Sequence, residues 1–387
     1  MSSSRHYGSH TASSYESAYF YSPGEYNDWL CDLVLDALAL GGTTTTTTTT
    51  TTMGGGLSSS SSSGSKEEDD REKRRGRPRG RRRLVLLDVG GGTGNFTRAI
   101  VERVGMGGGG GGAGGGDRLD AIVVDPFLSP AASVADTEGV RFVRADARDF
   151  IPTRERRRAV EGDDHGRDHD GEEEWEWEGE GDRSPSHSWK RGYDRVLLKE
   201  VVHHLDPADR VGIFKGLRDG FSIDNEREYD ECDGPSPIEE GKVEDGDEAK
   251  VGGKHDDGHG GGASLLVITR PRFEIDYPLW QEAREAWARD QPGADDIECD
   301  LRAAGFANVT RRTMTYSCAV SLEAWLRMVR NRFWSTFSHF TDEELDGGCA
   351  RIAEDARADE EGMVHFEERL VFISARAYYS RKLKINK

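Results

Sequence analysis

Short apolar runs separated by longer polar and helix-like stretches dominate the chain from Leu84 onward. A run of about four to eight apolar residues without alternation is typical of a strand buried on both faces. Five such runs cover residues 84–89, 121–125, 140–143, 193–198 and 264–269. A helical pattern spans residues 95–104, between the first two runs. The pattern predicts an α/β fold with a doubly wound, mostly parallel sheet covered by helices on both faces.

The C-terminal part adds two predicted strands and completes a seven-stranded sheet. They cover residues 308–316 and 363–375, and we expect them to form an antiparallel pair. Helices are predicted at residues 297–304 and from Leu322 to about Phe333. The Ser321 hydroxyl stands where it can cap the second of these helices.

Low-complexity stretches divide this pattern. The chain holds 48 glycines, and hydrophobic residues make up only 35% of it. Stretches that cannot bury enough apolar surface to offset chain entropy cover residues 41–65, 66–83, 105–116, 154–191 and 224–262. We therefore expect an N-terminal helical lid at 15–40, a disordered linker at 41–83, and one domain at 84–380 with disordered insertions. The last three stretches precede the second, fourth and fifth strands, so we place them at the amino edge of the sheet, away from the ligand-binding carboxyl edge.

A glycine-rich turn follows the first predicted strand and opens the first helix. Its spacing is Asp88-x-Gly90-x-Gly92-x-Gly94. Glycines at such a turn allow a tight bend and let a ligand approach the backbone. A dinucleotide-binding fingerprint starting at Gly90 would need its third glycine at position 95, which is Asn95. A phosphate-binding P-loop is excluded, because no Gly-Lys-Ser/Thr follows.

Polar residues also follow the next three strands. Asp125 ends the second strand, where a carboxylate can accept hydrogen bonds from both hydroxyls of a ribose. Asp146 and Ala147 follow the third strand, and Lys199 ends the fourth. Taken singly, such acids are as consistent with turn-forming residues. Their recurrence at successive carboxyl ends favours a shared binding site.

These motifs, in this order, resemble Rossmann-like (class I) S-adenosylmethionine-dependent methyltransferases of the small-molecule type. The resemblance spans residues 84–375 apart from the insertions. It implies S-adenosyl-L-methionine as the cofactor, with Asp88, Gly90, Gly92 and Gly94 around its methionine part. It further implies that Asp125 holds the ribose, that Asp146 and the Ala147 backbone N–H hold the adenine, and that Lys199 lies between cofactor and substrate. The acceptor implied is a small organic molecule.

Methyl transfer from a sulfonium needs alignment and exclusion of water, and a base only where the acceptor must lose a proton. His203 and His204 lie just past the fourth strand and are candidates for that base. The alternative is that one histidine packs and the other caps or is solvated. We expect no metal ion at this site.

Two aromatic regions are candidates for covering the cofactor and the acceptor. The first is the N-terminal segment, with Tyr19, Phe20, Tyr21, Tyr26 and Trp29. Its aromatic faces can attract a sulfonium, or they can simply dock a helix on the domain. The second lies at residues 313–340 and suggests an acceptor with a carboxylate, or else a surface helix with a solvated arginine face. It contains Trp325, Arg327, Arg330, Arg332, Phe333, Trp334 and His339.

A basic segment at residues 73–83 offers a competing interpretation. It resembles an AT-hook, in which Arg75, Arg77 and Arg79 would reach into a DNA minor groove. A nuclear DNA-associated factor is therefore the alternative function, and a solvated basic linker is the alternative structure. The net charge of −20 argues against the whole chain wrapping nucleic acid or binding an anionic membrane. The segment at residues 193–205, around the end of the fourth predicted strand, also lacks the Asn/Asp-Pro-Pro-aromatic and Pro-Cys signatures of DNA methyltransferases.

Cysteine content and the N-terminus bear on the compartment. The five cysteines are scattered and form no C-x-x-C pair, which favours a reducing compartment without disulfides or structural zinc. The first residues have no apolar core for a secretory signal, and the apolar run at 29–40 is too short and too charged to span a bilayer. We expect a cytoplasmic protein with no membrane contact, with the nucleus as the alternative.

Overall fold

A computed structural model of the protein describes residues 23–40, 83–106, 118–128, 139–151, 192–221 and 263–377. The described strands form a seven-stranded sheet in the order β3-β2-β1-β4-β5-β7-β6. The strands are β1 (Arg83–Val89), β2 (Arg118–Val124), β3 (Val140–Val143), β4 (Arg195–Lys199), β5 (Ser264–Thr269), β6 (Phe306–Ser321) and β7 (Met363–Ala377). β1 to β5 are parallel, whereas β7 runs antiparallel to both β5 and β6. The predicted mostly parallel sheet with an antiparallel final pair is confirmed.

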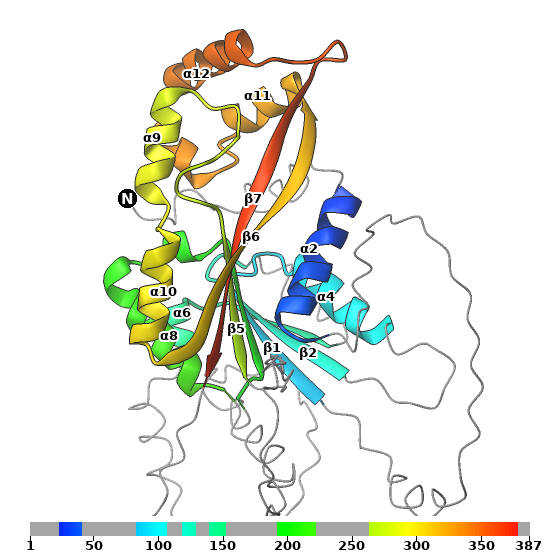
Figure 1. Ribbon diagram of the computed structural model, residues 1–387, viewed down its shortest axis with the longest axis vertical. Coiled ribbons are helices and arrows are strands. Elements are labelled where there is room, and N and C mark those ends of the chain that lie inside the picture. Colours follow the sequence, from blue (N-terminus) through cyan, green and yellow to red (C-terminus); the bar gives the residue numbers. More distant parts are fainter. Residues whose placement is uncertain are drawn as a thin grey trace, which may run out of the picture.

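Helices cover both faces of this sheet (Figure 1). α2 (Pro23–Ala37) and α4 (Asn95–Met106) lie on one side, and α6 (Ala147–Phe150), α8 (Pro207–Asp219) and α10 (Ala294–Ala303) lie on the other. Neighbouring strand residues alternate between the two cores, because side chains of a strand point to opposite faces. Leu86 packs on the α2 and α4 side and Leu87 on the α8 side, both with no exposed surface. Burial on both faces explains why these strands are continuous apolar runs.

β6 and β7 are much longer than the parallel strands and continue past their carboxyl ends (Figure 1). Four further elements gather at that end: α9 (Gln281–Asp290), α11 (Leu322–Arg330), the short 3-10 helix η5 (Ser335–His339) and α12 (Asp342–Asp355). We call residues 270–293 and 322–362 the cap. Its core is aromatic, with Tyr277, Trp280, Trp287, Trp325 and Trp334 all buried. The cap therefore stands over the carboxyl edge, where the sequence predicts the site.

Several predicted boundaries move. β6 extends from Phe306 to Ser321, beyond the predicted 308–316, because its pairing with β7 continues to Ser321 opposite Met363. α11 ends at Arg330 rather than near Phe333, because the chain turns at Arg332, which has a φ of 52°. The predicted Ser321 cap is confirmed, since its hydroxyl accepts from the Ala324 N–H.

The low-complexity predictions fall mostly on residues that the structure does not describe. α4 continues through Gly105 and Met106, two residues into the predicted glycine-rich stretch, and Arg83 belongs to β1 rather than to the linker. The rest of the predicted linker and insertions, and residues 15–22 of the predicted lid, lie outside the described residues. None of the described helices is long and apolar enough to cross a membrane.

Candidate active site

The glycine turn between β1 and α4 is built from left-handed backbone. Gly90, Gly92 and Gly94 have φ values of 76°, 57° and 74°, a region that side chains other than glycine rarely adopt. A Cβ at Gly90 would clash with Val201, and one at Gly94 would clash with Phe142. A Cβ at Gly92 would meet no atom within 4 Å. The outer two glycines are therefore required by packing, whereas Gly92 leaves open space that a ligand can approach.

Asp88 lies beneath this turn and is almost fully buried, with 2% of its surface exposed. Its Oδ2 accepts a hydrogen bond from the Thr97 hydroxyl of α4, and its Oδ1 has no partner among the described residues. Burial raises the pKa of Asp88 to about 6, while the Thr97 hydroxyl and the nearby Lys199 charge act to lower it. Asp88 thus helps to organise the loop through Thr97, and its buried Oδ1 remains as an acceptor for a ligand.

Asp125 ties the end of β2 to the glycine turn. Its Oδ2 accepts from the Gly92 N–H at 3.0 Å, and its Oδ1 accepts from the Phe127 N–H at 2.7 Å. Burial raises the pKa of Asp125, although the two N–H groups partly offset this by stabilising the charge. Each carboxylate oxygen has a second lone pair. The carboxylate can therefore hold the turn in shape and still accept hydroxyl groups from a ligand.

Asp146 is engaged with its own helix. It caps the N-terminus of α6, where its side chain accepts from the Arg148 N–H, and it forms an ion pair of 2.9 Å with the Arg148 guanidinium. The hydrogen bonds from Arg148 hold the pKa of Asp146 below its ordinary value. This arrangement matches the turn-forming alternative for Asp146. The adenine-binding roles of Asp146 and Ala147 stay predictions.

Lys199 ends β4 beside the glycine turn. Its Nζ lies 5.3 Å from the Phe96 ring centre and 3.7 Å from the Glu200 carboxylate. Glu200 has a φ of 55°, an unusual backbone conformation that is held by a hydrogen bond from its N–H to the Ile268 carbonyl. Such conformations cost free energy and cluster at functional sites. The carboxyl end of β4 therefore carries a cation whose charge acts on Asp88, followed by a largely buried carboxylate on strained backbone.

A buried polar network that sequence reasoning missed joins this edge to the cap. Arg270 follows β5 and pairs through Nη1 with Glu200; its Nε donates to Glu368 at 2.9 Å and to the Tyr277 hydroxyl at 3.0 Å. The Tyr277 hydroxyl in turn donates to Glu368 at 2.8 Å. Burial and the Glu368 charge raise the pKa of Tyr277 well above its usual value. The network fixes the cap to β4, β5 and β7.

His203 and His204 form the end of the 3-10 helix η3 (Val202–His204), directly past β4. Their rings lie 3.8 Å apart, centre to centre, and both are half-buried. Val202 between β4 and the histidines is fully buried and anchors the segment. The structure thus places both histidines at the carboxyl edge, as expected from the sequence. Their role as base stays a prediction.

The N-terminal helix α2 is docked rather than loosely laid over the site. Tyr26 and Trp29 pack on Tyr316 of β6, with ring centres 5.2 and 5.1 Å from it. The Arg195 guanidinium donates to the Leu38 carbonyl at 2.6 Å. Burial raises the pKa of Cys31 on α2 to about 11, and the Lys199 charge partly opposes the shift. The aromatic side chains of α2 therefore dock it beside the site, while Tyr19, Phe20 and Tyr21 lie outside the described residues.

The arginines of the predicted second aromatic region are paired with acids. Arg327 lies 3.9 Å from Glu323, Arg330 lies 2.9 Å from Asp346 and Arg332 lies 2.7 Å from Asp342. His339 pairs with Asp290 at 2.7 Å. Trp325, Phe333 and Trp334 are buried in the cap. These contacts support the structural alternative for this region, because no carboxylate ligand is needed to explain it.

The AT-hook-like segment and the question of a metal ion remain to be placed against the described residues. The basic segment with Arg75, Arg77 and Arg79 lies outside them. Within the described ranges, no group of three or more His, Cys, Asp and Glu side chains is placed to hold a metal ion.

The residues at the carboxyl edge fit S-adenosyl-L-methionine. Gly92 faces open space, Asp88 keeps a buried acceptor atom without a partner in the described structure, and Asp125 presents spare lone pairs beside the turn. The carboxylates of Asp88 and Asp125 have no cationic side chain paired with them in the described structure and suit a cationic ligand. The strand order and directions of this chain are those of the Rossmann-like methyltransferase fold, as the sequence predicted.

Comparisons with known proteins add likeness of fold alone. No family model matches the chain, and no curated protein matches it. Phosphoethanolamine N-methyltransferase 2 of Haemonchus contortus, bound to S-adenosyl-L-methionine, is 12% identical, with 80% of this chain and 51% of that chain covered and a TM-score of 0.36. This chain thus spans about half the length of that enzyme.

Two further solved structures are similar at the same level. A putative methyltransferase from an antibiotic biosynthesis pathway of Anabaena variabilis is 12% identical, covering 75% of this chain and 90% of that chain with a TM-score of 0.38. The [4+2]-cyclase SpnF is 11% identical, covering 78% and 76% with a TM-score of 0.35. The similar solved structures therefore include a cyclase as well as methyltransferases.

Proposed function

We propose that this protein is an S-adenosyl-L-methionine-dependent methyltransferase that acts on a small organic acceptor. The hydrogen bond between Asp125 and the Gly92 N–H is the observation that carries the proposal. It joins the acid after β2 to the one turn glycine that faces open space, and the buried Asp88 lies beneath the same turn. A turn so braced presents backbone and carboxylate oxygens together at the edge where ligands bind in such sheets.

The described residues divide the work of holding the cofactor. Gly90 and Gly94 shape the turn, Gly92 lets the cofactor approach the backbone, Asp125 accepts its ribose hydroxyls, and Asp88 offsets its positive charge. When bound, the cofactor supplies a methyl group already activated by the sulfonium. The protein then has to align the acceptor and keep water out. The docked α2 and the cap, fixed by the Arg270 network, provide the rigid walls for this.

His203 or His204 serves as the base where the acceptor carries a proton. Both stand past β4 at the same edge as Lys199. Deleting a base at this place lowers the rate by about two to four powers of ten. His203→Ala and His204→Ala should therefore lower kcat while leaving cofactor affinity unchanged. We propose that the reaction takes place in the cytoplasm.

Calorimetric titration with S-adenosyl-L-methionine and S-adenosylhomocysteine tests the proposal. We expect saturable binding by the wild type and binding at least about tenfold weaker by Asp125→Ala, because ribose contacts are lost. Asp120→Ala is the matched control: it removes a carboxylate from β2 itself, five residues before Asp125, at a position that pairs with Arg83 and Arg118. No binding by the wild type, or equal binding by Asp125→Ala, would overturn the site. A screen of small acceptors with methyl-labelled cofactor then identifies the product.

A further inference from the structure

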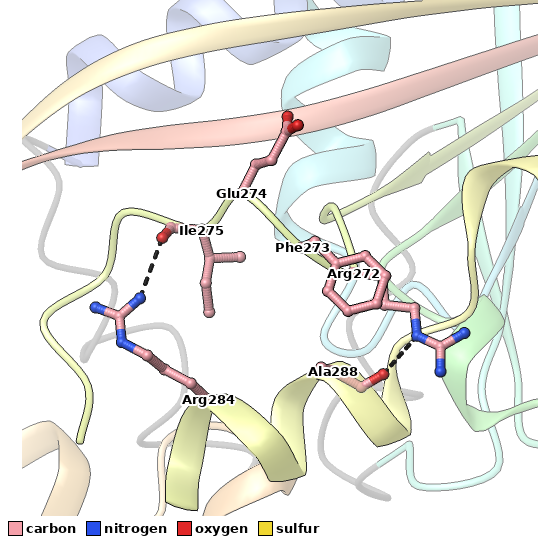
Figure 2. Close-up of a pocket in the computed structure, with 6 residues that line it drawn as sticks. All are labelled: Arg272, Phe273, Glu274, Ile275, Arg284 and Ala288. Atoms are coloured by element: carbon pink, nitrogen blue, oxygen red, sulfur yellow. Dashed lines mark hydrogen bonds between the residues drawn. The ribbon is translucent and has the colours of Figure 1, made fainter. Parts of the chain in front are cut away.

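A hollow open to solvent lies on the outer side of the cap, between the chain after β5 and helix α9 (Figure 2). It has a volume of about 180 Å³ and is lined by Arg272, Phe273, Glu274, Ile275, Arg284 and Ala288. The Phe273 side chain is 64% exposed. The one other large hydrophobic side chain that is exposed in the described residues is Met106, at the last position of α4. An exposed aromatic ring beside a hollow is a feature of binding sites.

Positive charge gathers around this hollow without acidic partners. Arg272, Arg284 and Arg369 form no ion pair within the described part of the chain, although most other arginines there do. Each of the three donates to a backbone carbonyl instead: Arg272 to Ala288 at 2.6 Å, Arg284 to Tyr277 at 2.7 Å, and Arg369 to Glu274. The lining itself holds two of these arginines, Arg272 and Arg284, against one acid, Glu274, which leaves one net positive charge that favours an anion.

The terminal nitrogens of Arg272 are available for that anion. Only its Nε is used, on the Ala288 carbonyl, and no other partner of this residue is present in the described structure. Its guanidinium also lies 5.3 Å from the centre of the Phe273 ring. The Glu274 side chain, the one acid of the lining, points away from α9 in Figure 2. A guanidinium beside an aromatic face is suited to a flat ligand with a carboxylate.

The loop that carries Arg272 and Phe273 is held rigidly. Arg284 donates to the carbonyls of Leu279 and Ile275 as well as Tyr277, and the Trp287 indole N–H donates to the Pro271 carbonyl at 3.0 Å. Glu274 has a φ of 59°, and its carbonyl accepts a hydrogen bond from Arg369 of β7. A site held in one conformation loses little entropy on binding. The loop is therefore organised before a ligand arrives.

The hollow is linked to the carboxyl edge by closeness in sequence. Arg272 lies two residues after Arg270, whose guanidinium is bound to Glu200 directly after Lys199. We propose that this hollow binds a small aromatic carboxylate, with the carboxylate on Arg272 and the ring against Phe273. That this ligand is the recognition part of the methyl acceptor rests on the proposed function. Binding of the carboxylate itself does not.

Benzoate is the probe, and its binding is measured by saturation-transfer NMR and by titration of the Phe273 signals of the full chain without cofactor. We expect a Kd on the order of 1 mM for so small a ligand. Arg272→Gln should weaken binding about tenfold or more, and Phe273→Ser should weaken it about fivefold. Arg289→Gln is the matched control: it makes the same substitution at an exposed arginine of α9 that pairs with Asp290 and lies outside the lining. It should bind benzoate as the wild type does.

Two other ligands test whether the hollow recognises a carboxylate. Benzyl alcohol should bind at least about tenfold more weakly than benzoate, because it lacks the charge. If phenyl phosphate bound more tightly than benzoate, the preferred anion would be a phosphate and not a carboxylate. That result would overturn the proposed ligand class. No saturable binding of benzoate, or equal binding by wild type and both lining variants, would overturn the site. Cofactor binding in the same samples separates these outcomes from failure of the proposed function, since Arg272 and Phe273 lie outside the cofactor residues.

Discussion

Arg270 and Glu368 form an ion pair of 2.9 Å in which the side chains are only 5% and 0% exposed. The pair joins the residue after β5 to the middle of β7, and Tyr277 of the cap closes it by donating to the same carboxylate. Taking two charges out of water is costly, and their mutual attraction offsets the cost only when the remaining hydrogen bonds are made. Here they are made, so the pair specifies where the cap sits relative to the sheet.

Removing one partner of this pair should be strongly destabilising. Glu368→Ala leaves the Arg270 charge and the Tyr277 hydroxyl short of an acceptor, and we expect a loss of about 3–5 kcal/mol in the free energy of unfolding. Urea unfolding followed by circular dichroism measures it. Asp346→Ala, which breaks the exposed pair with Arg330, should cost at most about 1 kcal/mol. Similar losses for the two variants would contradict the structural role of the buried pair.

Asp88 should make stability fall as pH rises through the acid range. Its pKa is about 6 in the folded protein and near 3.8 in the unfolded chain. Below pH 3.8 both states are protonated, and between pH 3.8 and 6 only the unfolded state ionises, which stabilises the unfolded state. Above pH 6 the loss is complete, at about 3 kcal/mol.

Comparison with Asp88→Asn isolates this effect, because the other carboxylates contribute equally to both proteins. Urea unfolding at pH 4, 5, 6 and 7 should show the wild type losing stability relative to the variant, with most of the change before pH 6. A difference that does not change with pH would mean that Asp88 ionises normally in the folded protein.

Substitutions in the glycine turn should affect the stability of the protein and its ligand binding to different extents. Gly92→Ala should lower the free energy of unfolding by about 1–2 kcal/mol. The cost comes only from placing alanine in left-handed backbone, since no atom lies near the added methyl group. Gly90→Ala adds a clash with Val201 and should lose about 1–3 kcal/mol more. Under the proposed function, Gly92→Ala should nevertheless weaken S-adenosylhomocysteine binding at least about tenfold, because its methyl group stands in the ligand's space.

Gly212→Ala is the control for these two variants. Gly212 lies within helix α8 and has no atom near its missing side chain, so alanine there should stabilise the protein by about 0.5–1 kcal/mol and leave binding unchanged. Unaltered cofactor binding in Gly92→Ala would show that the open side of the turn is not where the ligand lies.

The parallel sheet and its turn could be predicted because their signals are local. Strands buried on both faces leave continuous apolar runs, and Leu86 and Leu87 show why, since each serves a different core. The positions of Asp88, Asp125 and Lys199 then follow from where the strands end. The aspartate after β3 was harder, because the same residue type caps helices: Asp146 is held by Arg148 of its own helix.

Helix α9 of the cap and the buried polar network could not be predicted, for the opposite reason, although helix α11 of the cap was. α9 buries only Ala283, Ala286 and Trp287, which is too thin an apolar face to produce a strong helical pattern. Glu368 is separated by 98 residues from Arg270 and by 91 from Tyr277. A charged residue within a strand is normally taken to face solvent. Only the three-dimensional fold shows that its partners come from the chain after β5.

The charge of Lys199 should tune the ionisation of Asp88. Lys199 favours the ionised form of Asp88 and so lowers a pKa that burial raises. Lys199→Met removes that charge, and we expect the pKa of Asp88 to rise above about 6. Under the proposed function a cationic cofactor binds better to the ionised form, so the pH midpoint of S-adenosyl-L-methionine binding should move to higher pH. Lys215→Met, on the exposed side of α8, should leave the midpoint unchanged. A midpoint that stays constant or falls in Lys199→Met would contradict the coupling.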